Sequence, residues 1–102
     1  MIDLHLHTTA SDGLLIPAGL VARAAAVGLT IIAVTDHDTV GGLAEAVDAG
    51  RTHGMRVIAG IEVTAVEDTN DVHVLGYFID PGGPILAAFL REQRQDLSLI
   101  HI

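Results

Sequence analysis

Three short apolar runs in this chain each end in histidine or carboxylate side chains. These polar residues are, in chain order, His5 and His7, then Asp36, His37 and Asp38, and finally Glu62. Apolar runs of this length suit buried β-strands. The C-terminal ends of successive parallel strands lie together at one edge of a sheet, which is where α/β enzymes build their sites. The chain is therefore constrained to a fold that can gather these groups.

Stretches of helical character separate the apolar runs, with Pro17 near the start of the first and Gly28 and Gly54 after the two ends. Thr39 is the expected cap of the second helix. The predicted elements are strand 2–6, helix 17–27, strand 29–34, helix 41–53, strand 57–63, strand 72–79 and helix 85–96. This alternation implies an α/β fold with parallel strands and right-handed crossovers.

The composition narrows the function. The net charge is −8 with histidine neutral, so the chain lacks the basic surface that a stable nucleic-acid complex needs. A phosphorylated substrate is still compatible, because bound divalent cations reverse the local charge. No apolar stretch is long enough for a membrane span. Together with the lack of an apolar leader and of cysteine, this predicts a cytoplasmic protein.

The first polar group contains a potential chelate. His5 and His7 are two residues apart on an extended segment, so both side chains point to the same side. Two neutral imidazoles in that arrangement suit a metal ion. The alternative is an exposed histidine pair near the N-terminus. Asp12 follows in a loop beside Gly13 and is either a ligand or a turn residue.

The second group, Asp36-His37-Asp38, follows a strand buried on both faces, where an unpartnered charge is costly. His37 is a candidate ligand. Asp36 or Asp38 would orient a histidine ligand without binding the metal itself. The alternative is a solvated strand end at which Asp38 or Thr39 caps the next helix.

Glu62 is the most diagnostic single residue, because it interrupts an apolar strand and a metal would compensate its charge. A carboxylate can also bridge two metals. The alternative is a side chain that reaches water at the strand end. His73 opens the fourth strand, and the sequence leaves it open whether this histidine is a ligand or an ordinary surface residue.

Four segments resemble conserved motifs of the PHP (polymerase and histidinol phosphatase) family of metal-dependent phosphoesterases. They are His5-Leu6-His7-Thr8-Thr9 with Ser11-Asp12-Gly13, Thr35-Asp36-His37-Asp38-Thr39, Gly60-Ile61-Glu62-Val63, and His73-Val74-Leu75-Gly76-Tyr77-Phe78. The resemblance runs from residue 1 to about residue 96. It is strongest to small bacterial enzymes that act on 3′,5′-bisphosphonucleotides and short 5′-phosphorylated RNA.

The resemblance implies a distorted (β/α)7 barrel with two or three divalent metal ions, Mn²⁺ first, with Fe²⁺ or Zn²⁺ as alternatives. It also implies a ligand set. In that set His5 and His7 bind the first metal, Glu62 bridges the first and second, His73 binds the second, and Asp12 and His37 bind the third. Asp36 and Asp38 would not bind a metal themselves but would hold the ligand side chains in place.

A complete barrel needs about 250 residues, so we expect residues 1–96 to be the N-terminal portion of a PHP domain, inactive alone and with a long parallel edge exposed at its last strand. The six residues 97–102 break the preceding helical pattern. They can be back-translated as CTG TCT CTT ATA CAC ATC, the end of a transposase sequencing adapter. We expect them to be a non-native tail.

The sequence thus predicts hydrolysis of nucleotide phosphomonoesters or phosphodiesters by metal-activated water. A histidinol-phosphate phosphatase and a polymerase-associated PHP module are alternatives within the family. A metal-binding interaction module without catalysis is the alternative from another class.

Overall fold

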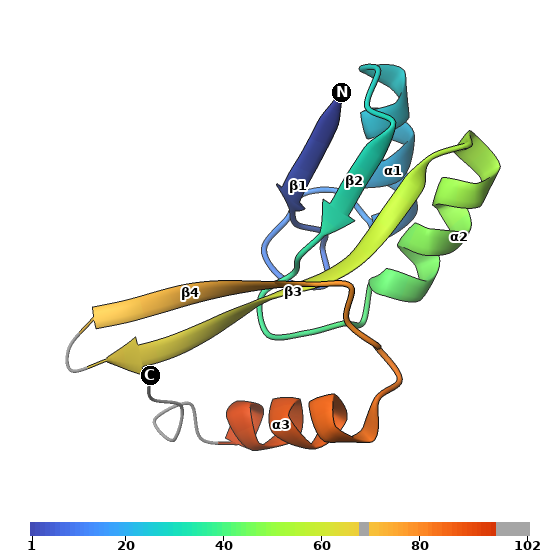
Figure 1. Cartoon of the computed structure of the whole chain (residues 1–102). Helices are drawn as coiled ribbons and strands as arrows, with labels where there is room; N and C mark the ends of the chain where they lie inside the picture. The colour runs from blue at the N-terminus through green and yellow to red at the C-terminus, as the bar shows by residue number, and fades with distance from the viewer. Residues whose placement is uncertain (68–69, 96–102) are drawn as a thin grey trace.

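The computed structural model describes residues 1–67 and 70–95. Strands β1 (Ile2–Leu6), β2 (Ile31–Val34), β3 (Arg56–Glu67) and β4 (Asn70–Tyr77) form one sheet in the order β1-β2-β3-β4. Helices α1 (Pro17–Ala26) and α2 (Leu43–His53) lie beside one another against β1–β3, and helix α3 (Pro84–Gln95) lies beneath the β3–β4 hairpin (Figure 1). The predicted α/β alternation is confirmed.

The first three strands are parallel, as predicted. The fourth is not: β4 pairs antiparallel with β3, from Gly60 opposite Tyr77 to Glu67 opposite Asn70. The expectation of a parallel edge at the last strand is therefore wrong. The reason is the connection between β3 and β4, which is far too short for the crossover that parallel strands require. Strand β3 also continues beyond the predicted end at residue 63 and projects with β4 as a long arm (Figure 1).

The core lies between the helices and the first three strands. Val21 and Ala24 of α1 meet Ile32 and Val34 of β2, and Leu43, Ala46 and Met55 complete the cluster, all with exposed fractions of 7% or less. Small side chains let the layers approach closely. At Gly50 of α2 an added Cβ would lie 2.7 Å from the Val57 side chain.

Helix α2 begins later than predicted. Gly42 is its N-cap and no side chain caps it, so the prediction that Thr39 caps this helix is wrong. The hydroxyl of Thr39 instead accepts a hydrogen bond from the Gly41 amide at 3.1 Å, within the loop. At the other end Gly54 adopts a left-handed conformation (φ 65°) and ends the helix, as predicted.

No helix in the described part of the chain is long and apolar enough to cross a bilayer. The expected non-native tail at 97–102 lies outside the described residues, so that expectation stays a prediction, as does the domain boundary at residue 96.

Candidate metal centre

The four strands bring the predicted ligands together. His5 lies on β1 and His7 directly after it, and His37 follows β2. Glu62 lies on β3 and His73 on β4. His37 forms an isolated parallel bridge with Glu62, since the Asp38 amide donates to the Glu62 carbonyl and the Glu62 amide to the Asp36 carbonyl. This pairing fixes His37 next to Glu62.

His73 reaches the same place by a different route. It lies on β4 opposite Thr64, so the hairpin folds it back over Glu62. The antiparallel strand is therefore part of the site, because a parallel β4 would not present His73 from this direction.

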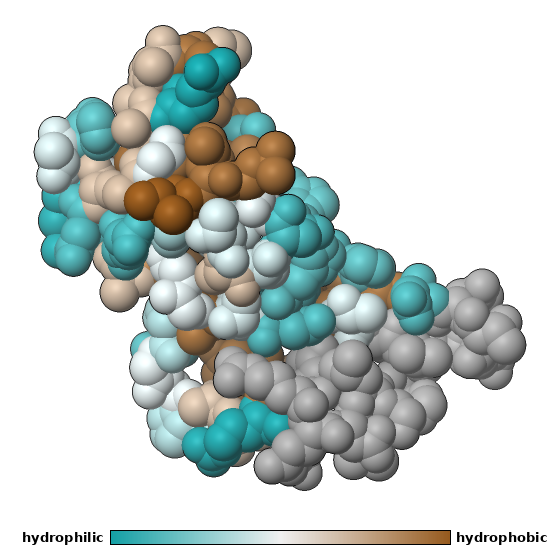
Figure 2. All heavy atoms as spheres, turned by 180° about the vertical axis from the view of Figure 1, so that it is seen from behind, coloured by the Kyte–Doolittle hydropathy of each residue, from teal (hydrophilic) through white to brown (hydrophobic). Residues whose placement is uncertain are grey.

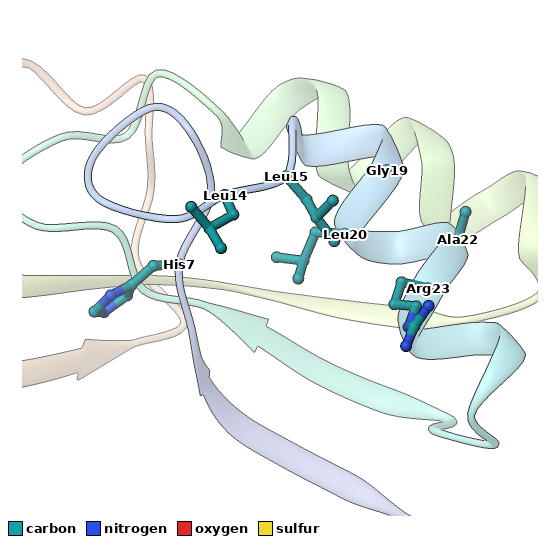
Figure 3. Close-up of a pocket in the computed structure, with 7 residues that line it drawn as sticks. All are labelled: His7, Leu14, Leu15, Gly19, Leu20, Ala22 and Arg23. Carbon is teal, nitrogen blue, oxygen red and sulfur yellow. The ribbon is translucent and has the colours of Figure 1, made fainter.

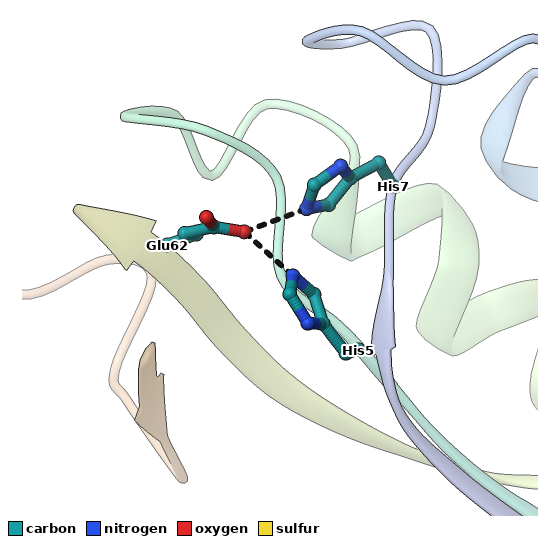
Figure 4. Close-up of side chains that lie close together, drawn as sticks. All are labelled: His5, His7 and Glu62. Carbon is teal, nitrogen blue, oxygen red and sulfur yellow. Dashed lines mark hydrogen bonds and ion pairs between the residues drawn. The ribbon is translucent and has the colours of Figure 1, made fainter. Parts of the chain in front are cut away.

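Glu62 lies at the middle of the cluster and is only 4% exposed. Its Oε1 lies 2.7 Å from His5 Nε2 and 2.9 Å from His7 Nε2 (Figure 4). Its Oε2 lies 2.7 Å from His73 Nδ1 and 3.7 Å from His37 Nδ1. One carboxylate thus faces four imidazoles. The alternative that Glu62 reaches water at a strand end is wrong.

Asp12 forms a second bridge between two of these imidazoles. Its Oδ1 lies 2.8 Å from His7 Nδ1 and its Oδ2 lies 3.2 Å from His37 Nε2. His7 and His37 therefore each face a carboxylate oxygen with both ring nitrogens. A neutral imidazole carries only one N–H, so the His7 ring cannot donate to both of its carboxylate neighbours, and a cation could take the place of the second N–H.

The donor set fits divalent cations. Three overlapping triads have their ligand atoms within 4.8 Å of one another: His5-His7-Glu62, His7-Asp12-His37 and His37-Glu62-His73. Cation–nitrogen bonds of about 2.0–2.1 Å place neighbouring ligands roughly 3–3.5 Å apart, so the spacing is suitable. Imidazole and carboxylate without thiolate suit Mn²⁺, Fe²⁺ or Zn²⁺.

The electrostatics of Glu62 favour its role as an anionic ligand. Burial by itself raises the pKa of the Glu62 carboxyl. Hydrogen bonds from His5, His73 and His7, with the charge of His37, outweigh burial and lower that pKa from 4.5 to about 2. Glu62 is therefore an anion at neutral pH, and no proton has to leave it before it meets a cation.

The two predicted supporting carboxylates do not contact an imidazole through any of their described hydrogen bonds. Asp36 is buried and accepts hydrogen bonds from Thr8 and Ser11. Asp38 has a positive φ of 56° and accepts from the Thr64 amide at 2.9 Å. Neither caps α2. Sequence reasoning missed Thr8 and Ser11, although a buried carboxylate with no nearby lysine or arginine in the sequence signals a need for such donors.

Protons and cations compete for the imidazoles of this cluster. We expect the affinity of the chain for a divalent cation to fall as the pH is lowered, because histidine must be neutral to act as a ligand. Calorimetric titrations in two buffers of different ionisation enthalpy will count the protons released. Affinity independent of pH would contradict binding through these histidines.

A separate apolar hollow of about 780 Å³ lies between α1 and the loop before it. Its walls include Leu14, Leu15 and Leu20, with Arg23 at one end, and His7 touches its rim with the ring directed away from the leucines (Figure 3). Leu14 is 96% exposed. Seen from behind, the upper part of the molecule carries a group of apolar residues bordered by polar ones (Figure 2). Of the residues that line this hollow, only His7 also belongs to the cluster around Glu62.

Comparison with known proteins identifies relatives of this arrangement. The PHP domain matches residues 3–99. A 3′,5′-nucleoside bisphosphate phosphatase of Chromobacterium violaceum is 45% identical over 94 residues, which are 92% of this chain and 33% of the relative. A 5′-3′ exoribonuclease of Haemophilus influenzae is 40% identical over 92 residues, 90% of this chain and 34% of that protein.

A solved structure has the same fold as this chain. A protein of Bifidobacterium adolescentis assigned as a metal-dependent phosphoesterase superimposes with a TM-score of 0.85 at 36% identity, over 92% of this chain and 33% of its own. The chain thus spans about a third of the length of the relatives it matches.

Proposed function

This chain belongs to the PHP family, and on that basis we propose that it is part of a metal-dependent phosphoesterase that hydrolyses phosphomonoester or phosphodiester bonds of nucleotides. The observation that carries the proposal is the convergence of four imidazoles and two carboxylates from separate elements on one small volume.

The ligand assignment is part of the proposal. We assign His5 and His7 to a first cation, Glu62 to a bridge between the first and second, His73 to the second, and Asp12 and His37 to the third. The three triads around Glu62 and Asp12 support this division. His7 and His37 each belong to two triads, so these two rings lie between neighbouring cation positions.

Divalent cations bound here would supply Lewis-acid chemistry, activating water and neutralising phosphoryl charge. The protein holds the ligands so that little rearrangement is needed. Glu62 is anionic and nearly buried, while His5 and His73 remain about half exposed, at 52% and 45% of their side chains. The open side of the cluster is therefore bounded by imidazoles, and we propose that the substrate phosphate approaches there.

The substrate is inferred from the relatives and the charge, and the metal from the imidazole and carboxylate donors of the cluster. We propose Mn²⁺ as the metal and a small phosphorylated nucleotide or a short 5′-phosphorylated RNA as the substrate, in a cytoplasmic protein. A net charge of −8 favours a small substrate held by cations at one site over a nucleic acid bound along its length.

A chimera tests this proposal. Residues 1–95 of this chain replace the matching segment of the Chromobacterium violaceum relative, and phosphate release from adenosine 3′,5′-bisphosphate is measured. We expect hydrolysis that depends on Mn²⁺ and falls at least about a hundredfold after chelation. The unmodified relative is the control. A folded chimera that binds Mn²⁺ but hydrolyses neither a bisphosphonucleotide nor a 5′-phosphorylated dinucleotide would refute the proposed activity.

A further inference from the structure

Asp36 is a buried carboxylate beside the cluster that accepts three hydrogen bonds, and it is not among the proposed ligands. It is 2% exposed. Its Oδ1 accepts from the Thr8 amide at 2.6 Å and from the Ser11 hydroxyl at 2.9 Å, and its Oδ2 accepts from the Thr8 hydroxyl at 2.6 Å. Both carboxylate oxygens therefore accept hydrogen bonds from the loop between β1 and α1.

That loop presents Asp12. Further hydrogen bonds close it on Thr8, whose carbonyl accepts from the amides of Ser11 (3.1 Å) and Gly13 (2.8 Å). Gly13 sits so close to the strand end that an added Cβ would lie 2.3 Å from the His7 carbonyl oxygen. Asp12 stands between the two anchored residues Ser11 and Gly13. Its own side chain is 60% exposed, so its position depends on the loop and not on burial.

The main chain of Asp36 contacts the opposite side of the cluster. Its carbonyl accepts from the Glu62 amide at 3.0 Å, and the next residue, His37, bridges to Glu62. Asp36 thus connects the Asp12 loop through its side chain with β3 through its backbone. A displacement of either would change the distance between Asp12 and His37, now 3.2 Å from Oδ2 to Nε2.

We propose that Asp36 is a positioning residue that clamps the Thr8–Ser11 turn and so holds Asp12 at the distance from His37 that a cation requires. This inference rests on the proposed function, because it assigns the control of one cation position in the same centre. The clamp acts most directly on the Asp12–His37 position, because the side chain of Asp36 holds neither His5 nor Glu62 and reaches His7 only through the neighbouring Thr8.

Cation binding by the full chain tests the clamp. Mn²⁺ titrations followed by electron paramagnetic resonance and calorimetry compare the unmodified chain with Asp36→Asn, Asp12→Asn and the double variant. We expect Asp36→Asn to lower the affinity of the Asp12-dependent position for Mn²⁺ at least about tenfold. The affinity of the tightest position should stay within about twofold of the unmodified chain. Because both changes act through Asp12, the double variant should bind no more weakly than Asp12→Asn alone. Full additivity, or unchanged affinities in Asp36→Asn, would overturn the clamp.

Two further measurements keep the result decisive. Ser11→Ala removes one donor to Asp36 and leaves the carboxylate bonded to Thr8, so it serves if Asp36→Asn does not fold; we expect about threefold weaker binding at the Asp12-dependent position with an unchanged melting temperature. Because the Ser11 hydroxyl also donates to Asp12 Oδ1 at 3.4 Å, the weaker binding supports the clamp only together with faster exchange in the turn. Amide hydrogen exchange at Gly13 in the metal-free chain should accelerate about tenfold in the same variant. Unchanged exchange there and unchanged binding would overturn the clamp. A chain that binds no Mn²⁺ but shows the accelerated exchange would contradict the proposed function and leave the clamp standing.

Discussion

Replacing Glu62 with alanine in the chimera should lower the rate of bisphosphonucleotide hydrolysis by about a thousandfold or more, equivalent to roughly 4 kcal/mol of transition-state stabilisation. Glu62 faces His5, His7 and His73 at 2.7–2.9 Å. Removing it takes away the one carboxylate that all three imidazoles share, so the two cations that we assign to this bridge lose a common ligand and a compensating charge. Bound manganese, measured by elemental analysis, should fall with activity.

Asp71→Asn is the matched control for Glu62→Ala, because it removes an exposed carboxylate from β4, the partner strand. Its activity should stay within about twofold of the parent, as expected for a surface change. The variant Glu62→Gln separates charge from size, since it keeps the shape of the side chain and loses the anion. If Glu62→Ala hydrolyses substrate at the parental rate with the parental metal content, the ligand assignment fails.

The location of the cluster could be predicted because it follows from a general property of parallel sheets. His7, His37 and Glu62 follow or interrupt successive apolar strands, and parallel strands place such residues at one edge. No knowledge of side-chain geometry was needed. His73 could not be placed by this reasoning, because its strand runs the other way and reaches the cluster only through the hairpin.

The role of Asp36 could not be predicted for a different reason. The position of Asp36 in the sequence indicated a buried carboxylate next to the metal ligands. The expected hydrogen-bond partner of this carboxylate was a histidine. The observed partners, Thr8 and Ser11, lie 28 and 25 residues away in sequence, and ordinary hydroxyl residues in a loop carry no distinctive pattern. The length of β3 was also missed, because the apolar run and the polar Glu62 suggested a strand end where the structure has the middle of a strand.

Gly60→Ala should destabilise the fold by about 2–3 kcal/mol, enough to lower the melting temperature of a domain of this size by roughly 10 °C or more. Gly60 lies where β3 stops pairing with β2 and starts pairing with β4. An added Cβ would lie 2.7 Å from Thr35 Cγ2, 3.0 Å from the Gly76 carbonyl oxygen and 3.2 Å from the Val34 carbonyl oxygen.

None of these three neighbours of Gly60 can move cheaply. The two carbonyl oxygens belong to strands of the sheet, and Thr35 is fully buried with its hydroxyl donating to the Leu6 carbonyl at 3.3 Å. The strand itself must therefore shift, and Glu62 lies only two residues further along it. We accordingly expect weaker Mn²⁺ binding to accompany the loss of stability, because the carboxylate would leave the imidazoles that surround it.

Gly76→Ala isolates the steric cause. Gly76 lies on the same hairpin opposite Ile61, and neither Gly60 nor Gly76 has a positive φ, so alanine is conformationally allowed at both. An added Cβ at Gly76 has its nearest neighbours at 3.6–4.0 Å, which is ordinary contact. Chemical denaturation of the full chain should therefore place Gly76→Ala within about 1 kcal/mol of the parent, since alanine also restricts the unfolded chain. Equal destabilisation by both substitutions would show that strand conformation, and not the crowding around Gly60, sets the cost.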